Sequence, residues 1–244
     1  YTTLFRSNST TSPSILFSEE ELPPLVRSLR LRPGVSMCAR DEHRRVQWCD
    51  ANFAKQFGMT PADMVGSTLV DAYGTKVADS RMTAMQPELW KHGMYSCIQL
   101  WGGMRVTSHT WNRNYAKGEK YSIVSILDPR PVADAALDAS LPTLLEPNWG
   151  SFNKLSRREL EVLYLVAMGF NAEETARRLS RAEKTVENHV ASIYDKLGIH
   201  TRAEVTRIAV ERGILAFTQE QWFMIASRYP RESRIVTGGE PNAA

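Results

Sequence analysis

Hydrophobic positions recur every three or four residues from residue 155 to residue 215, which is the period of amphipathic helices. Within this stretch, a Ser, Asn or Thr followed three positions later by Glu predicts three helix starts: Ser156 with Glu159, Asn171 with Glu174, and Thr201 with Glu204. Gly169 and Gly213 predict where the first and last of these helices end. The pattern therefore predicts a compact all-α unit.

A longer helix is predicted in RAEKTVENHVASIYDKLG, after a short helix over 172–179 and a tight turn. One of its faces is an apolar stripe: Val186, Val190, Ile193 and Leu197. The opposite face is small and polar: Lys184, Asn188, Ala191 and Asp195, with Glu187 beside it. This arrangement suits a helix that enters a DNA major groove roughly 12 Å wide. Basic residues around the turn and the helix are placed to reach phosphates: Arg177, Arg178, Arg181, Lys184 and Lys196.

The first half of the chain has the shorter, alternating pattern of β-strands. GVSMCAR and VQWC predict a hairpin, and two short helices capped by Asp50 and Thr60 follow it. A longer helix is predicted over 76–91, and then three antiparallel strands in YSCIQLW, MRVTSHTWNRNY and YSIVSILD, with a turn at Gly102 and Gly103 and a loop at AKGEK. This order predicts an α+β unit with one five-stranded antiparallel sheet and helices on one face.

Changes in composition divide the chain further. We expect a flexible N-terminus with a short helix after Ser18 over 1–34, an α+β domain over 35–128, and a Pro- and Ala-rich linker with one short helix before Pro142 over 129–154. The all-α domain follows over 155–215, and an extra helix in TQEQWFMIASRY with a disordered tail over 216–244. Trp222 and Phe223 of the extra helix are expected either to cap a dimer or to dock on the α+β domain. Two folded domains result.

Composition is that of an ordinary globular chain, with 43% hydrophobic and 23% charged residues. Thirty basic and twenty-seven acidic residues give a net charge of only +3, so any nucleic-acid contact depends on local placement of cations. The sequence contains neither a run of eighteen apolar residues nor a signal peptide, and we expect a cytoplasmic protein. The odd number and the spacing of Cys38, Cys49 and Cys97 predict reduced, buried thiols.

Catalytic motifs are absent from the sequence, which contains no G-x-S-x-G elbow, no Walker loop and no H-E-x-x-H. Asp41 and Glu42 after an apolar strand suggest the acidic pair of a phosphorylated receiver domain, but such a domain needs parallel βαβ units. His189 and His200 are interpreted as packed or loop histidines. We therefore do not expect an enzyme, and we expect no metal site.

Residues 155–215 resemble the LuxR/GerE-type helix-turn-helix domain of bacterial transcription regulators. The resemblance rests on R-E-x-E-V-L, G-x-x-x-x-E-x-A-x-x-L, K-T-V-x-N-H-V and K-L-G-I-x-x-R-A-E. It implies that the third of four helices reads DNA, with Glu187, Asn188 and Ala191 in the groove and Lys184 and Thr185 near the backbone. It also implies that the fourth helix mediates dimerisation through Thr201, Val205, Ile208, Ala209 and Arg212.

Two residues depart from this family pattern. Glu187 stands where a lysine is frequent, and a carboxylate there would accept a hydrogen bond from a cytosine amino group rather than bind phosphate. Ala182 stands where Ser or Thr usually caps the recognition helix, at a cost of roughly 1 kcal/mol unless Ser180, with Glu183 three residues later, provides the cap. We therefore expect this helix to start slightly earlier or less firmly.

Residues 35–128 resemble a PAS sensory domain through D-A-N-x-A-x-x-F-G-x-x-x-x-D-M-V-G-S-T, in which Asn52, Phe53, Phe57, Gly58 and Gly66 match. The resemblance implies a small-molecule ligand or a dimerisation role. The sequence identifies no cofactor. We interpret His92 as a surface or capping histidine rather than a haem ligand, and the flavin signature N-C-R-F-x-Q is missing. The candidates to line a cavity are Trp48, Trp90, Trp101 and Trp111. The candidates to bind a carboxylate ligand are Arg105 and Arg113.

Together these features predict a homodimeric bacterial transcription regulator whose PAS-like domain modulates a LuxR-type helix-turn-helix. The implied partners are double-stranded DNA, a second copy of the chain and RNA polymerase, with no membrane. Alternatives are an acyl-homoserine-lactone-type or receiver-type LuxR regulator, and a protein-interaction module without DNA binding. Global charge does not separate these alternatives, so the exposed face of the predicted recognition helix is the deciding feature.

Overall fold

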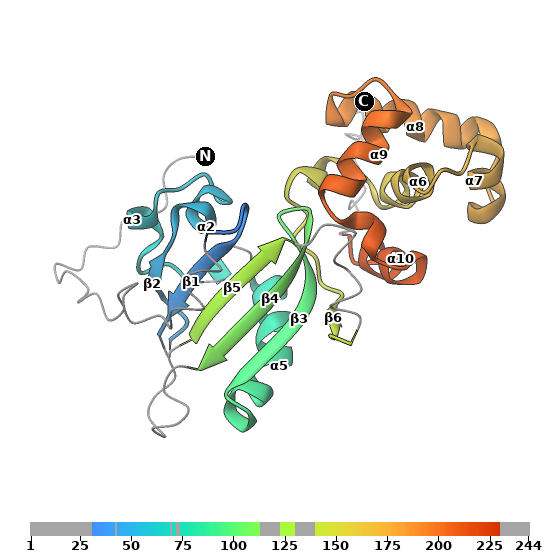
Figure 1. Ribbon diagram of the computed structural model, residues 1–244. Helices are drawn as coiled ribbons and strands as arrows, with labels where there is room; N and C mark the ends of the chain where they lie inside the picture. Colours follow the sequence, from blue (N-terminus) through green and yellow to red (C-terminus); the bar gives the residue numbers. More distant parts are fainter. Residues whose placement is uncertain are drawn as a thin grey trace, which may run out of the picture.

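The computed structural model describes residues 31–41, 43–68, 70–71, 74–112, 123–129 and 140–229, which form a sheet unit and a helical unit (Figure 1). Several predicted features lie outside these residues: the short helix after Ser18, the AKGEK loop, the linker helix before Pro142, Arg113 and the C-terminal tail. Among the described helices, none combines the length and the apolar composition needed to cross a membrane.

The sheet unit has the predicted strands, β1 (Ser36–Arg40), β2 (Val46–Cys49), β3 (Met94–Trp101), β4 (Met104–Asn112) and β5 (Ile123–Pro129). They pair antiparallel in the order β2-β1-β5-β4-β3, which confirms the five-stranded antiparallel sheet and gives a PAS-like fold. A sixth strand, β6 (Thr143–Leu144), was not predicted and pairs parallel with β3 at the edge of the sheet. A receiver-type domain would need parallel central strands, so the described sheet unit is not a receiver domain.

Helices α2 (Ala51–Lys55), α3 (Pro61–Met64) and α5 (Thr75–Lys91) join the second strand to the third, as predicted. The Asp50 carboxylate accepts the backbone N–H of Phe53 at 2.8 Å, which fixes the start of α2. Side chains of α2 and α3 pack with those of the sheet in one buried cluster: Phe53, Ala54, Met64, Cys38, Val46, Cys49, Trp101, Val106 and Leu127. Three buried side chains of α5, Met82, Met85 and Leu89, form a second cluster with Tyr95 of β3.

The three cysteines are free and buried, as the sequence predicted. Burial raises the pKa of the Cys49 and Cys97 thiols to about 12, so both are protonated at neutral pH.

His92 ends α5 with an exposed imidazole 3.7 Å from Glu88, which is the surface and capping position that the sequence favoured. Of the four tryptophans considered for a cavity, Trp101 lines one and Trp90 is more than half exposed.

The helical unit begins with a short 3-10 helix, η4 (Gly150–Lys154), and continues through α6 (Arg157–Ala167), α7 (Ala172–Leu179), α8 (Glu183–Leu197) and α9 (Arg202–Glu211). A second 3-10 turn, η5 (Ile214–Ala216), leads to α10 (Gln219–Ser227). Capping boxes are present at Ser156, Asn171 and Thr201, as predicted. The four helices α6 to α9 confirm the all-α unit.

The extra helix α10 is part of the core of the helical unit. Trp222 is fully buried, and its indole N–H donates to the Leu160 carbonyl at 2.8 Å. Its ring stacks on Tyr164 at 6.1 Å and meets Trp149 edge-on at 6.0 Å. Within this protomer, Trp222 is therefore not available to cap a dimer, because the apolar surface of α6 already covers it. The extra helix does touch the sheet: the neighbouring Gln221 donates to the Thr143 hydroxyl of β6 at 3.3 Å, and Ile98 and Leu100 of β3 belong to the same buried cluster as Trp222.

The two units touch where the β3–β4 turn meets the segment before η4 (Figure 1). The Gly103 N–H donates to the Asn148 carbonyl at 3.0 Å, and the Asn148 N–H donates to the Leu100 carbonyl at 3.0 Å. Gly150 lies so close to the turn that a Cβ there would be 2.3 Å from the carbonyl carbon and oxygen of Gly102. Glycine at position 150 is thus required by the close approach of two backbones.

We expect Gly150→Ala to open this contact, because the new methyl group meets backbone atoms that have no room to move. Gly58→Ala is the matched control: Gly58 also has a positive φ, of +67°, but nothing lies within 4 Å of its Cβ position. Both variants carry the cost of a left-handed alanine, about 1–2 kcal/mol, and Gly150→Ala carries about 1–3 kcal/mol more.

Hydrogen exchange measures this difference directly. Peptides that contain Gly103 and Asn148 should exchange faster in Gly150→Ala than in Gly58→Ala, because their amides bridge the two units. Equal exchange in the two variants would contradict the close-approach argument.

Candidate nucleic-acid interface

Helices α7 and α8 form the helix-turn-helix. The turn between them is tight, because Ser180 ends α7 in the left-handed conformation with φ of 53° and the Arg181 N–H closes back onto the Ala176 carbonyl at 2.9 Å. Helix α8 begins at Glu183 with Ala182 at its N-cap, and no side chain caps it. Since Ser180 terminates α7 and does not cap α8, the expected earlier start is wrong, and the missing side-chain cap is what the alternative expectation, a less firm start, implies.

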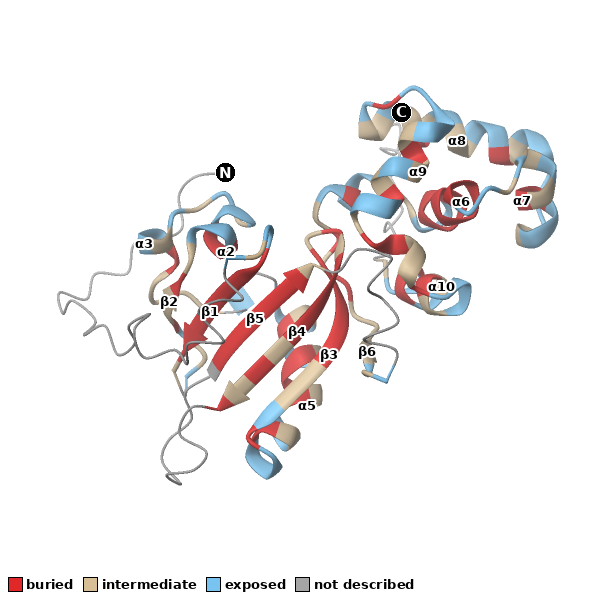
Figure 2. Ribbon diagram, in the orientation of Figure 1, coloured by how far each residue is buried: buried red, intermediate tan, exposed pale blue. Residues whose placement is uncertain are grey.

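Helix α8 presents the two faces that the sequence predicted. Val186 and Ile193 are buried, and Val190 and Leu197 are partly buried against the same core. The opposite face is exposed: Lys184, Glu187, Asn188, Ala191 and Asp195. Figure 2 shows α7 and α8 at the end of the helical unit farther from the sheet. The sheet unit therefore does not cover the exposed face of α8.

Glu159 of α6 fixes the position of α8. Its carboxylate lies 2.7 and 2.8 Å from the Lys196 ammonium and 2.5 Å from the Ser192 hydroxyl, and it accepts the Ser156 N–H at 2.6 Å. Burial by itself would raise the pKa of Glu159, but the hydrogen bonds from Lys196, Ser192 and Ser156 lower this pKa to about 2. The buried carboxylate thus stays charged and ties the last two turns of α8 to the first turn of α6.

This tie changes the interpretation of Lys196, which the sequence placed near phosphates. Its ammonium is held by both oxygens of Glu159, so we leave Lys196 out of the proposed DNA-contacting set. The capping box at Ser156 and Glu159 was visible in the sequence. The partners of Glu159 on α8 lie 33 and 37 positions away, and no spacing rule reaches that far.

The other basic side chains near the turn are exposed. Arg177 pairs with Glu173 at 3.3 Å, and the Arg178 guanidinium lies 3.8 Å from the centre of the Phe170 ring. Lys184 pairs with Glu187 at 3.0 Å. Exposed pairs of this kind contribute little to stability, so a phosphate can replace the carboxylate at modest cost. Arg181 is exposed, and Thr185 is partly buried in the first turn of α8.

The predicted dimerisation residues of α9 do not share one free surface. Val205 and Ala209 are buried in the core of this protomer, and Ile208 packs against the same core. The Arg212 carbonyl accepts the Arg105 N–H of β4 at 2.8 Å, and its guanidinium reaches the Gly102 carbonyl at 3.4 Å. Within this protomer Val205, Ala209 and Arg212 thus contact other parts of the chain, and their place in a dimer interface stays a prediction. The outward face of α9 instead carries Ala203, Arg207 and Val210, together with Thr201 at its N-cap.

Comparison with known proteins matches residues 153–209 to the family described as bacterial regulatory proteins, luxR family. The oxygen regulatory protein NreC of Staphylococcus aureus strain JH9 is 41% identical over 66 residues. That match covers 27% of this chain and 30% of NreC, so the chain spans less than a third of the length of this relative. The helical unit thus contains a luxR-type helix-turn-helix, and the match includes α6, α7, α8 and most of α9.

Solved structures resemble the chain more loosely. The Vibrio cholerae VqmA dimer, described in the absence of target DNA, is 16% identical with a TM-score of 0.39, and the match covers 83% of this chain and 93% of that one. A phage VqmA–DPO complex is 16% identical with a TM-score of 0.40, and the match covers 82% of this chain and 94% of that one. The PAS domain of Bordetella pertussis BvgS is 17% identical with a TM-score of 0.34, and the match covers 47% of this chain and 90% of that one. All three TM-scores are below 0.5, so nothing about ligand or assembly follows from them.

We expect Glu159→Gln to lower the free energy of unfolding by about 2 kcal/mol at pH 7, because it removes a charge-assisted pair and leaves Lys196 without its partner. Since the folded pKa of about 2 lies below the ordinary value of 4.5, this stabilisation is complete above pH 4.5. It is lost as the pH falls from there towards 2. Denaturant unfolding of both proteins across this range measures the difference.

Glu204→Gln is the matched control, because Glu204 occupies the same capping-box position of α9 but is solvent-accessible. Its substitution should cost less at pH 7. Equal costs at the two positions, or a wild-type advantage that persists undiminished at pH 2, would rule out Glu159 as the tie between α6 and α8.

Ala182→Ser should stabilise the helical unit by about 1 kcal/mol, because it supplies the missing acceptor for the first turn of α8. Ala191→Ser, on the exposed face of the same helix, should be slightly destabilising through lower helix propensity. Thermal unfolding of the two variants separates capping from a general effect of serine. A stability order with Ala191→Ser above Ala182→Ser would contradict the capping argument.

Proposed function

Because residues 153–209 form a luxR-type helix-turn-helix domain, we propose that the chain is a homodimeric transcription regulator that binds double-stranded DNA and whose PAS-like domain controls DNA binding. The matched family consists of regulatory proteins and not of enzymes. The observation that carries the proposal is the exposed face of α8, which a protein-packing helix would bury. RNA polymerase is a further proposed partner.

In this proposal Asn188 and Ala191 approach base edges, because they are short and lie near the middle of the exposed face. Lys184, Arg178 and Arg181 contact phosphates around the first turn of α8 and the preceding turn, with Thr185 beside them. Glu187 has two roles. It neutralises Lys184 in the free protein, and in the complex it accepts a hydrogen bond from a cytosine amino group.

We propose that two copies pair through the outward face of α9. Val210 is 44% exposed there and lies on the same face as the exposed Ala203, whereas Val205, Ile208 and Ala209 turn toward the protomer core. A twofold pair of α8 helices would read two half-sites about 34–36 Å apart. Footprinting of the bound sequence and sedimentation of the free chain measure the spacing and the dimer.

Control by the PAS-like domain is supported by the direct contact between the two units. The end of α9 touches β4 through the Arg105 N–H and the Arg212 carbonyl, and the Arg212 guanidinium lies 5.1 Å from the Phe152 ring. A shift of the β3–β4 turn therefore moves the C-terminal end of the proposed dimerisation helix. We propose that a signal in the sheet unit alters the separation of the two DNA-reading helices by this route.

Binding to duplex DNA at several salt concentrations tests the proposal. Lys184→Met should weaken binding to all sequences and reduce the slope of log K against log salt by about 0.9, the value for one phosphate contact. Asn188→Ala should change the preference between sites. Glu187→Gln should strengthen non-specific binding, because it frees Lys184 and removes a negative charge from the face that meets the phosphates.

Glu88→Gln is the matched control, since it removes the same charge from an exposed contact, that of Glu88 with His92 on α5, away from the proposed DNA-binding and dimer surfaces. It should leave the affinity for a single half-site unchanged. No retention on random duplex DNA at low salt would favour the protein-interaction alternative, and unchanged affinities in all three α8 variants would reject the assignment of residues.

A further inference from the structure

Two of the three buried cysteines lie directly opposite each other in the sheet. Cys38 of β1 and Cys49 of β2 are partners in the antiparallel register of these strands. Opposed residues of two paired strands share a face, and both cysteines belong to the buried cluster that includes α2 and α3. Only 2% and 3% of their surfaces are exposed. The two thiols are therefore neighbours, although the sequence predicted no pairing between them.

Backbone hydrogen bonds fix the spacing of this pair. The Asp50 N–H donates to the Met37 carbonyl at 3.1 Å, so the hydrogen-bonded pair is Met37 with Asp50, one step along the ladder. Bonded and non-bonded pairs alternate between antiparallel strands, which makes Cys38 and Cys49 a non-bonded pair. The Cα atoms of such a pair lie about 4.5 Å apart, within the range of about 4.4–6.8 Å that a disulfide spans. A disulfide can therefore join the two strands without a change of register.

The third cysteine, Cys97, lacks this geometry. It lies on β3, which is separated from β1 by β5 and β4, and its direct partner on β4 is Ser108. Neighbouring strands are about 4.8 Å apart, so its Cα is roughly 14 Å from that of Cys38. That distance is far beyond the limit of about 7 Å for a disulfide. Cys97 is thus a buried thiol that serves as an internal reference for the other two.

We propose that Cys38 and Cys49 are a redox-active dithiol, which hydrogen peroxide converts reversibly into a disulfide between β1 and β2. The Cys49 thiolate attacks one peroxide oxygen, which gives a sulfenic acid and one molecule of water. The Cys38 sulfur then attacks the Cys49 sulfur, the S–S bond forms and the hydroxyl leaves as a second water. In sum the dithiol loses two electrons and two protons, and the peroxide is reduced to water. A small dithiol reverses the reaction by thiol–disulfide exchange.

Opening of the edge strand controls access to the pair. Strand β2 is at the edge of the sheet, and on its outer side only Val46 has backbone hydrogen bonds to described residues, with Gly66 and Ser67. Burial raises the pKa of Cys49 to about 12, so the closed sheet keeps this thiol protonated and slow to react. When β2 separates from β1, the thiol meets water and its pKa returns to its ordinary value. We therefore assign the first attack to Cys49 and the second to Cys38.

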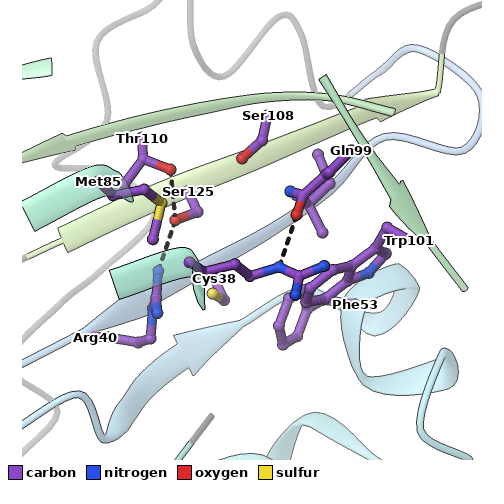
Figure 3. Close-up of a pocket in the computed structure, with 11 residues that line it drawn as sticks. Cys38, Arg40, Phe53, Met85, Gln99, Trp101, Ser108, Thr110 and Ser125 are labelled. Carbon is purple, nitrogen blue, oxygen red and sulfur yellow. Dashed lines mark hydrogen bonds between the residues drawn. The ribbon is translucent and has the colours of Figure 1, made fainter. Parts of the chain in front are cut away.

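The disulfide would fix the start of α2. Asp50 follows Cys49 directly and caps this helix, and Phe53 of the helix packs on Trp101 with ring centroids 6.4 Å apart. Cys38, Phe53 and Trp101 line the cavity between the sheet and helices α2 and α5 (Figure 3). Trp101 is the last residue of β3 before the turn that touches the helical unit. An effect of oxidation on DNA binding by this route rests on the proposed function, whereas the dithiol itself does not.

Peptide mapping of the full chain after treatment with hydrogen peroxide tests the dithiol. Digestion without reductant should give one linked pair of peptides, which contains Cys38 and Cys49, and Cys97 should remain open to alkylation. Thiols titrated in denaturant should fall from three per chain to one, and dithiothreitol should restore all three. The oxidised chain should unfold at a midpoint about 4–10 °C higher, because the bond restricts the unfolded state.

Cys97→Ala is the matched control, since it removes an equally buried thiol and should keep both the linked peptides and the shift of the midpoint. Cys38→Ala should abolish both, and its Cys49 should accumulate as a sulfenic acid that dimedone labels. Cys49→Ala should also abolish both. Each of these two variants removes the bond independently, so either one suffices if the other does not fold.

Four outcomes overturn the proposal. They are a linked peptide that contains Cys97, a disulfide between two chains, three intact thiols at a peroxide concentration that oxidises the urea-unfolded chain, and a lower midpoint for the oxidised form. The last would mean that the bond distorts the hairpin and does not fit the folded sheet. None of these outcomes involves DNA, so they are distinguishable from a failure of the helix-turn-helix assignment.

Discussion

A buried charged side chain is costly unless another group compensates it, and this constraint fixes the position of the DNA-reading helix α8 in the helical unit. In the helical unit, the buried carboxylate of Glu159 is satisfied by Lys196, Ser192 and Ser156, and the orientation of α8 follows from those bonds. In the sheet unit, the buried guanidinium of Arg40 has one bond to Ser125 and no counter-charge in the described part of the chain. The first arrangement is complete within the described residues, and the second is not.

The β3–β4 hairpin connects these two sites physically. Its strands contribute Gln99, Trp101, Ser108 and Thr110 to the cavity, and its turn touches the segment before η4. The same strands reach α9 through the backbone bond between Arg105 and Arg212. A change in the packing around Trp101 would therefore act on a hairpin whose other end contacts the helical unit. Rigid elements with direct contacts are the kind of path by which coupling between sites is carried.

Local rules were sufficient for most of the secondary structure. Capping boxes, the Gly-Gly turn and the two hydrophobic periods depend on residues within about four positions of one another, and the structure contains the predicted helices and strands of both units. The exposed and buried faces of α8 were predicted for the same reason. The two-residue strand β6 was missed because Thr143 and Leu144 lie in a proline-rich segment with no alternating pattern, and only pairing with β3 makes them a strand.

By itself, the sequence determined the element order, the helix-turn-helix and its outward face, because short-range patterns encode these features. Only the tertiary structure decided which charged groups are free. Lys196 was expected at a phosphate and is held by Glu159, Val205 and Ala209 were expected at a dimer interface and are buried, and Arg40 was not singled out at all. These roles depend on contacts between residues tens of positions apart, and the long-range packing that creates them leaves no periodic signal in the chain.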